Sequence, residues 1–453
     1  MGILSSLFAG VSGLNANGNQ LTIIGNNVAN LSTIGFKSSK ATFADLVSSS
    51  LGGGSGVLQV GIGVALTSVQ PSFTQGSLVT SGNALDLAVD GNGFFIVKDA
   101  TGGTFYTRAG QFHLDKDNKV VDPSGYKLQG YQTDANNAIT GSIGDISLPS
   151  TTAAPNTTTT GTISVNLYSA ATATTFSLAD PTGTSNFSTS MTVYDSLGTS
   201  HLLTFYFTKT AANTWTYNIT ANTSEVTSAN YNAANKNTTL GITLVGKGTL
   251  TFTTGGALDT ESVVTNYDDG TAGGTAGAVA GRLQIDFSGS TQNQLITFNY
   301  GTSITTDSGT TGLDGTTQFG SASALVTQTQ NGYAAGALQA FLVDSTGTIS
   351  GRFSNGQLRT LAQVTLGRFP SNLGLTRVGK NLFAETRDSG QPLKGAPDTA
   401  GMGKVQSNSL ELSNVDLGES FIDMISAQRG FQANSRVITT ADEILQELVN
   451  IKR

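Results

Sequence analysis

Cysteine is absent from the 453 residues of the chain, which excludes disulfides, thiolate metal sites and cysteine nucleophiles. Histidine is nearly absent: neither His113 nor His201 has a second metal-ligand residue at the spacing of a helical turn or a hairpin. We interpret both as structural or exposed side chains. The nucleophile-elbow pattern Gly-x-Ser-x-Gly is also missing. No metal or cofactor site is expected, and the chain is not predicted to be an enzyme.

Charged side chains are scarce, at 12% of the chain, which is about half the usual share. The net charge is −7, and no basic cluster or basic stripe with interleaved aromatic residues occurs, so nucleic acid is not an expected partner. No run of about eighteen apolar residues exists, so no membrane insertion is predicted. The first cationic side chain is Lys37, so the charged start of a cleaved secretory signal is missing.

What the chain has instead is glycine, at 56 residues, with many threonine, serine and asparagine residues. This mixture favours short strands and turns over large apolar cores. Only the two ends depart from it, because both carry helical periodicity. We therefore expect a mixed, mainly β chain with a coiled-coil-like α-helix at each terminus.

The N-terminal stripe combines two opposing signals. Apolar residues recur every seven positions, which is the spacing of a helical seam. Gly13, Gly18 and Gly25 interrupt it, and each costs the helix about 1 kcal/mol relative to alanine. We predict a helix over 1–31 that forms poorly in the free chain and becomes ordered on assembly. Its expected packing residues are Leu4, Leu7, Val11, Leu14, Leu21, Ile24, Val28 and Leu31.

The C-terminal stripe predicts a second helix within 413–453, with Ser413 or Asn414 as its N-cap. Either helix could simply pack on its own domain. Two stripes at opposite termini, with β-like sequence between them, favour pairing of the two helices and contacts with neighbouring subunits. The expected packing residues here are Leu417, Phe421, Met424, Phe431, Ile438, Leu445 and Leu448.

The middle of the chain divides by composition. Residues 32–72 read as a connector with extended structure over Val57–Val69. The hinge candidates are Gly25 in the N-terminal stripe and Gly52, Gly53, Gly54 and Gly56 in the connector. Residues 73–148 and 328–404 have strand and turn patterns, with hairpins predicted at Asp90–Gly93 and Asn355-Gly356. In residues 149–327 apolar and polar residues alternate, which predicts strands with polar outward faces. The simplest topology is nested, with 149–327 inserted as one or two β units.

Three motif-like stretches have plain explanations. "GLTRVGKN" (Gly374–Asn381) resembles a phosphate loop, but Asn381 replaces the Ser or Thr that binds Mg²⁺. "DKDNKVVD" (Asp115–Asp122) lacks the sixth-position glycine and the distal glutamate of a calcium loop. "MGILSS" fits a loose myristoylation pattern without a following polybasic patch. We predict no nucleotide site at the first, a turn with solvated acidic side chains at the second and the start of the helix at the third.

Several longer stretches carry a family resemblance. "NNVANLSTIGFK" (Asn26–Lys37) is similar to the N-terminal signature of bacterial flagellar rod and hook proteins, and Leu85–Val97, Tyr106–Tyr131 and Ser413–Ile451 resemble further signatures of that family. Val193–His201, Gly347–Gln357 and the size of the 149–327 insertion resemble its hook-forming members. The family-motif residues are Asn26, Asn27, Asn30, Gly35 and Phe36.

The resemblance implies a cofactor-free subunit of a curved, flexible tube outside the cell, which transmits torque from the rod to the filament. The terminal helices would form the inner tube, the middle β unit a shell and the inserted unit the outermost layer. Implied partners are further copies of the chain, the distal rod protein, the hook–filament junction protein, the hook cap and the flagellar type III export apparatus. Three alternatives stay open: a distal rod protein, another secreted β-rich filament or adhesin subunit, and a β-rich polysaccharide hydrolase.

Overall fold

The computed structural model describes residues 2–46, 61–134, 137–148, 152–227, 231–262, 265–267, 277–278 and 282–451. The chain is mainly β with one long helix at each terminus, so the predicted fold class is confirmed. It divides into two compact units. Unit 1 comprises Met1–Ser150, Gln339–Arg352 and Leu358–Arg453, and unit 2 comprises Thr151–Leu338 and Phe353–Gln357.

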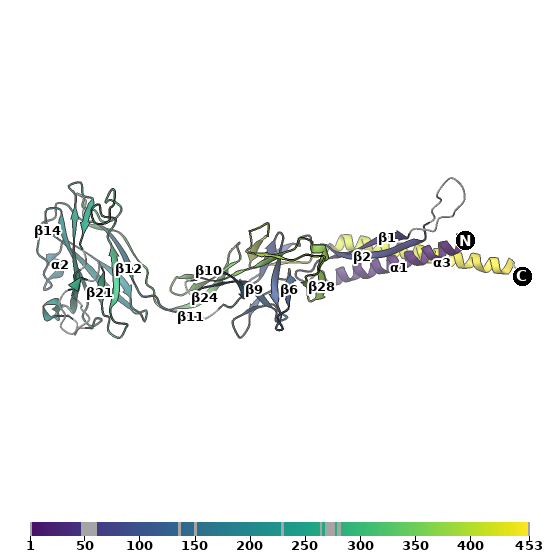
Figure 1. Ribbon diagram of the computed structural model, residues 1–453, viewed down its shortest axis with the longest axis horizontal. Coiled ribbons are helices and arrows are strands. Elements are labelled where there is room, and N and C mark those ends of the chain that lie inside the picture. Colours follow the sequence, from purple (N-terminus) through teal and green to yellow (C-terminus); the bar gives the residue numbers. More distant parts are fainter. Residues whose placement is uncertain are drawn as a thin grey trace. The chain divides into compact units, whose positions relative to one another are not determined.

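The two terminal helices, α1 (Gly2–Ala29) and α3 (Leu417–Ile451), lie side by side in unit 1 and run antiparallel (Figure 1). The N-cap of α3 is Asp416, whose Oδ1 accepts hydrogen bonds from the N–H groups of Gly418 at 2.7 Å and Glu419 at 3.1 Å. The prediction of Ser413 or Asn414 as the cap is therefore wrong. Asn414 instead accepts a hydrogen bond from the N–H of Ser38 at 2.7 Å.

Small side chains form the seam between the two helices. A Cβ at Gly13 would lie 2.6 Å from Nδ2 of Asn434, and one at Gly430 would lie 2.7 Å from Oδ1 of Asn17. Ala427 and Ala441 of α3 are buried. Gly13 thus does more than weaken α1, because it also provides space for a side chain of α3. A Cβ at Gly18 or Gly25 would meet no atom within 4 Å.

An antiparallel hairpin, β1 (Ser39–Leu46) with β2 (Gly63–Pro71), packs along α1. The Oγ of Ser12 accepts a hydrogen bond from the N–H of Val64 at 3.2 Å, which ties β2 to the helix. Extended structure was predicted for the second strand, but the first was missed. The hinge candidates Gly52, Gly53, Gly54 and Gly56 lie outside the described residues.

The β part of unit 1 combines strands that precede unit 2 in the sequence with strands that follow it. Strand β9 pairs with β26, β5 with β27, and β6 with β29, all antiparallel. Apolar side chains of these strands, including Phe95, Val97, Leu128 and Val364, form its larger core. Its elements are β3 (Leu78–Thr80), β4 (Leu87–Asp90), β5 (Phe94–Lys98), β6 (Thr104–Thr107), β7 (His113–Leu114), β8 (Val120–Val121), β9 (Lys127–Thr133), β10 (Ile139–Asp145), β25 (Thr348–Phe353), β26 (Leu358–Val364), β27 (Leu366–Arg368), η3 (Asn372–Gly374), β28 (Thr376–Gly379), β29 (Leu382–Ala384), β30 (Leu393–Gly395), β31 (Lys404–Ser407) and β32 (Ser409–Glu411).

The hairpin predicted at Asp90–Gly93 is wrong, although the turn exists. Strand β4 pairs with β31 and not with β5. A two-residue type I′ hairpin turn needs positive φ at two successive residues, whereas here only Gly91 and Gly93 have it. The turn instead packs against Gly403, whose N–H donates a hydrogen bond to the carbonyl of Asn92 at 2.6 Å.

Two further turn predictions are confirmed. Strands β25 and β26 form a hairpin whose turn contains Asn355-Gly356. In the acidic stretch, Oδ1 of Asp115 accepts the backbone N–H groups of Asp117 and Lys119, both at 2.8 Å, as a solvated turn requires. The segment resembling a phosphate loop is the β28–β29 hairpin. The element directly after this turn is the strand β29, where a phosphate loop has the N-terminus of a helix.

Unit 2 is built from two sheets with one shared core. One sheet has the order β13-β14-β15-β17-β19-β20 and the other β21-β22-β12-β23. In β14 the side chains alternate, with Leu203, Phe205 and Phe207 buried. The elements are β11 (Thr152–Ala153), β12 (Thr160–Asn166), α2 (Pro181–Thr184), β13 (Phe187–Tyr194), β14 (Ser200–Ala211), β15 (Thr214–Asn222), η2 (Ala233–Asn235), β16 (Lys236–Asn237), β17 (Ile242–Phe252), β18 (Leu258–Glu261), β19 (Thr265–Asn266), β20 (Gly277–Ala278), β21 (Leu283–Ile285), β22 (Gln294–Asn299) and β23 (Ala324–Gln330); β24 (Gly336–Val343) continues from unit 2 into unit 1.

His201 has acidic neighbours that sequence spacing did not reveal. Its Nδ1 lies 2.9 Å from Glu225 Oε2 and its Nε2 lies 3.3 Å from Asp195 Oδ2. The ring stacks on Phe287 with a centroid distance of 3.8 Å. Burial by itself would raise the pKa of Asp195, but hydrogen bonds from Thr199 and His201 outweigh it and lower that pKa. His201 therefore joins three loops, and the structural interpretation of this histidine fits its place.

Glu261, at the end of β18, is an ionisable group in an unfavourable place. Its Oε2 is buried and has no hydrogen-bond partner among the described residues. Burial raises the pKa of Glu261 to about 7, and the nearby carboxylate of Asp307 adds to the rise. Between pH 4.5, its unfolded value, and pH 7 the folded chain binds the extra proton, so this group lowers stability as the pH rises.

Glu261→Gln should raise the stability of unit 2 at pH 8 by roughly 1–2 kcal/mol, after allowance for partial solvent screening. At pH 4 the glutamate is protonated in both states, so the variant and the parent should then be equally stable. Urea unfolding followed by the fluorescence of Trp215, the single tryptophan of the chain, measures both. A stabilisation of equal size at both pH values would contradict the ionisation argument.

Candidate assembly interface

The terminal helices leave much of their apolar surface uncovered. On α3 the side chains of Phe421, Ile422 and Ile425 are 48%, 69% and 52% exposed, and on α1 Phe8 is 60% exposed. Of the predicted packing residues, Ile24 is buried; Val11, Leu417, Phe421 and Phe431 are exposed; and Leu7, Leu14, Leu21, Val28, Leu31, Met424, Ile438 and Leu445 are half-buried. The described side chains do not include Leu4 and Leu448. Exposed apolar area of this extent is typical of an interaction surface.

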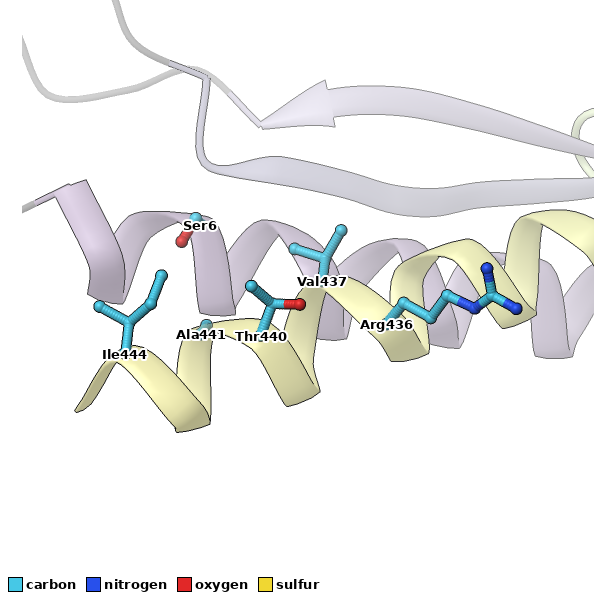
Figure 2. A pocket seen from close by; sticks show the side chains of 6 residues that line it. All are labelled: Ser6, Arg436, Val437, Thr440, Ala441 and Ile444. Carbon is cyan, nitrogen blue, oxygen red and sulfur yellow. The ribbon is translucent and has the colours of Figure 1, made fainter. Parts of the chain in front are cut away.

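An open groove of about 360 Å³ runs between the two helices. Figure 2 shows Val437, Thr440 and Ile444 of α3 on one side, with Ser6 of α1 opposite them. Ala441 forms part of the lining and leaves room because its side chain is small. The groove therefore continues the uncovered apolar surface between the helices.

The asparagines of the family motif end α1 and attach it to β1. The side chain of Asn27 donates to the carbonyl of Ser39 at 2.8 Å and accepts from the N–H of the same residue at 2.9 Å. The side chain of Asn30 donates to the carbonyl of Asn26 at 2.9 Å, which also accepts the backbone N–H of Asn30 at 3.2 Å, so both groups of Asn30 hold the last turn of the helix. Asparagine fits both positions because its amide is both donor and acceptor. Gly25 has no comparable contact.

Gly35 and Phe36 lead the chain from α1 into the β part of unit 1. Gly35 has φ of +68°, and a Cβ there would lie 2.5 Å from the backbone nitrogen of Ala109, so only glycine fits. Phe36 is buried, and the guanidinium of Arg377 lies over its ring at 5.4 Å. The side chain of Asn381 donates to the carbonyl of Ile34 at 2.8 Å. Asn381, the residue that departs from the phosphate-loop pattern, therefore fixes the chain where it leaves α1.

Lys37, Arg108 and Glu411 form a buried charge cluster at the root of both helices. Oε1 of Glu411 lies 2.6 Å from Nζ of Lys37, and its Oε2 lies 3.3 Å from Nη1 of Arg108. The carboxylate also accepts the N–H of Gly76 at 2.9 Å. Burial lowers the pKa of Lys37 and of Arg108, while the charge of Glu411 opposes both shifts.

The excess positive charge of this cluster is met by backbone carbonyls. Lys37 Nζ donates to the carbonyl of Thr74 at 2.7 Å, and Arg108 donates to those of Val89 at 3.1 Å and Gly91 at 2.6 Å. The cluster therefore connects the exit of α1, the end of β6, the loop before β3 and the approach to α3. Buried groups arranged in this way specify one geometry.

Sequence reasoning quoted Lys37 in the motif but missed the cluster. A local signal existed, since Lys37 is the first charge in the chain and lies directly after the buried Phe36. Its carboxylate partner is 374 residues away, a separation that no spacing rule bridges. No group of three or more His, Asp or Glu side chains in the described part of the chain could hold a metal ion. No described helix is long and apolar enough to cross a membrane.

Glu411→Gln should leave two buried cations without a counter-charge and lower the stability of unit 1 by about 3–5 kcal/mol. Urea-dependent hydrogen exchange of the backbone amides of β5, β9 and β26, which pair with one another within unit 1, measures the loss. Asp398→Asn is the matched control, because the pair of Asp398 with Lys404 at 3.8 Å is solvent-exposed and should contribute less than about 1 kcal/mol. Equal effects of the two substitutions would refute the importance of the buried cluster.

Comparison with protein-family models places four matches along the chain. Residues 7–37 match "Flagella basal body rod protein", 88–165 match "Flagellar hook protein FlgE/F/G D1 domain", 166–333 match "Flagellar basal body protein FlaE D2 domain" and 406–451 match "Flagellar basal body rod FlgEFG protein C-terminal". The first match includes the motif from Asn26 to Lys37. Its end coincides with the residue that binds Glu411.

Full-length relatives agree with these matches. The flagellar hook protein FlgE of Escherichia coli K12 is 35% identical over 98% of both chains, and that of Borreliella burgdorferi is 33% identical over 99% of this chain and 100% of the relative. Among solved structures, Helicobacter pylori flagellar hook protein FlgE2 aligns with 74% of this chain and 100% of its own, at 16% identity and a TM-score of 0.49. The full-length sequence relationships show that the chain belongs to the flagellar hook protein family.

Proposed function

We propose that the chain is a structural subunit of the flagellar hook, without catalytic activity, that self-assembles into a curved, flexible tube and transmits torque from the rod to the filament. The observation that carries this proposal is the uncovered apolar surface of the helix pair, at the two ends that match family models. Neighbouring copies of the chain cover that surface in the tube.

In this proposal each part of the chain has its own layer. Residues 1–31 and 413–453 form the inner tube, and 32–72 form the connector. Residues 73–148 and 328–404 form the middle layer, and 149–327 form the outer one. The strand pairings between β9 and β26 and between β5 and β27 support a single middle layer made from two stretches of sequence.

The proposed neighbours are the distal rod protein below the hook, the hook–filament junction protein above it and the hook cap during growth. The chain leaves the cell through the flagellar type III export apparatus and works outside it. Two features support export in an extended form. Helix α1 contains no charged residue and includes five glycines, four of which lie inside the helix and weaken it, so α1 is easily unfolded before assembly.

Purified protein at high concentration should form tubes under negative-stain electron microscopy. Curved tubes support the proposal, whereas straight and rigid tubes, which a distal rod protein would form, would contradict it. Protein that stays monomeric at every concentration and salt condition would overturn the proposal.

Limited proteolysis tests whether the helix pair becomes stable on assembly. We expect residues 1–31 and 413–453 to be cleaved rapidly in the monomer and protected in the tube. Gly18→Ala with Gly25→Ala should slow cleavage of α1 in the monomer, because each substitution favours the helix by about 1 kcal/mol and both sites have open space for a Cβ. Ends that are equally resistant in monomer and tube would contradict ordering on assembly.

A further inference from the structure

Unit 2 has a pocket on the face of its β14-β15-β17 sheet that points away from the core. In β14 the core face holds Phe205 and Phe207, so Thr208 lies on the opposite face, where it lines the pocket. The pocket has a volume of about 330 Å³. This volume is at the lower end of the range for ligand sites, which suits a small ligand.

Two buried polar atoms of this pocket have no hydrogen-bond partner within the described ranges. They are Oγ1 of Thr208 and Nδ2 of Asn218. Thr208 is fully buried, and Asn218 is only 3% exposed. Buried polar groups in folded proteins nearly always have partners, because an unpaired group loses its hydration without compensation. The two atoms therefore indicate a ligand that accepts a hydrogen bond from Asn218 and pairs with the hydroxyl of Thr208.

Strand pairing places a cation beside these two groups. Asn218 of β15 lies opposite Lys247 of β17, so their side chains are neighbours on one face of the sheet. Lys247 lines the pocket and is exposed, and no ion pair in the part of the chain that the structure describes includes it. A lysine next to an unpaired amide N–H favours a ligand with a carboxylate and further oxygen acceptors.

Aromatic rings form another wall of the pocket. Phe176, in the loop before α2, and Tyr267, directly after β19, both line it. The ring of Phe176 packs on that of Tyr206 with a centroid distance of 5.7 Å. Two residues further on, the carbonyl of Leu178 accepts a hydrogen bond from Nδ2 of Asn237 at 2.8 Å. The wall is thus held in place without a ligand, which lowers the entropy cost of binding one.

We propose that this pocket binds an acidic sugar, a hexuronate. A pyranose ring has C–H groups on its face and oxygens around its edge. It packs on Phe176 and Tyr267 while its oxygens pair with Asn218 and Thr208, and its carboxylate pairs with Lys247. A phosphate ligand fits less well, because the described lining residues offer one cation and no arginine fork. The site is independent of tube formation, since its described residues all belong to unit 2.

Titration with glucuronate, followed by saturation-transfer NMR on the full-length chain, tests the site. The dissociation constant should be on the order of 1 mM, as expected for a ligand of this size. Glucose lacks the carboxylate and should bind about tenfold more weakly. Lys247→Met should remove this preference and leave the binding of glucose unchanged.

Asn218→Leu and Thr208→Val replace the two unpaired groups by apolar side chains of similar size. Each should weaken glucuronate binding about tenfold, because the ligand loses a hydrogen bond in a buried place. Each should also keep or raise the stability of the free chain towards urea, because a buried polar group without a partner is removed. The matched control is Thr204→Val, on the same face of β14 but outside the lining, which should bind glucuronate as the parent does.

Three results would overturn the proposal. One is the absence of binding of glucuronate, or equal binding by the parent and Asn218→Leu. Another is a loss of stability in both Asn218→Leu and Thr208→Val, which would assign these side chains a structural role. The third is tighter binding of a short acidic peptide than of glucuronate, which would assign the pocket to a peptide ligand. Tube formation is a separate measurement, and its outcome decides the proposed function alone.

Discussion

The carboxylate of Glu411 is the interaction on which the geometry of unit 1 depends. It lies six residues before α3 and binds Lys37, which lies eight residues after the end of α1. Together with the hydrogen bonds of Asn27, Asn381 and Asn414, this buried group fixes the ends of both helices against the β part of the unit. A buried carboxylate with two cationic partners has few alternative arrangements, since each unpaired charge would be costly in the interior.

The helix pair itself is stabilised weakly by comparison. Its seam consists of glycine, alanine and asparagine, which allow a close approach but bury little apolar area. The larger apolar side chains, such as Phe421 and Ile422, point outward. This division suits a subunit whose helices meet several neighbours. A rigid attachment at Glu411 orients the pair, and the outward residues remain available for contacts between copies.

Unit 2 is stabilised by its own core, unlike the helix pair. Its core contains large aromatic side chains, among them Trp215, Phe205 and Tyr300, all fully buried. It is therefore stabilised from within and needs no partner to complete its core. The contrast with the helix pair supports an outer layer that folds alone and an inner layer that is completed by assembly. The buried carboxyl of Glu261, whose pKa is raised by burial, makes that internal stability depend on pH.

The sequence by itself determined the class of the fold, the two terminal helices, most turns and the family. These depend on local periodicity, on glycine and asparagine at turns, and on contiguous motifs. Only the tertiary structure decided that Lys37 meets Glu411, that β4 pairs with β31 and that Asp195 and Glu225 flank His201. Asp195 and His201 lie six residues apart around one turn, but the other contacts join residues that no local pattern relates. Strand partners and buried charge pairs of that kind are selected by the energy of the whole fold.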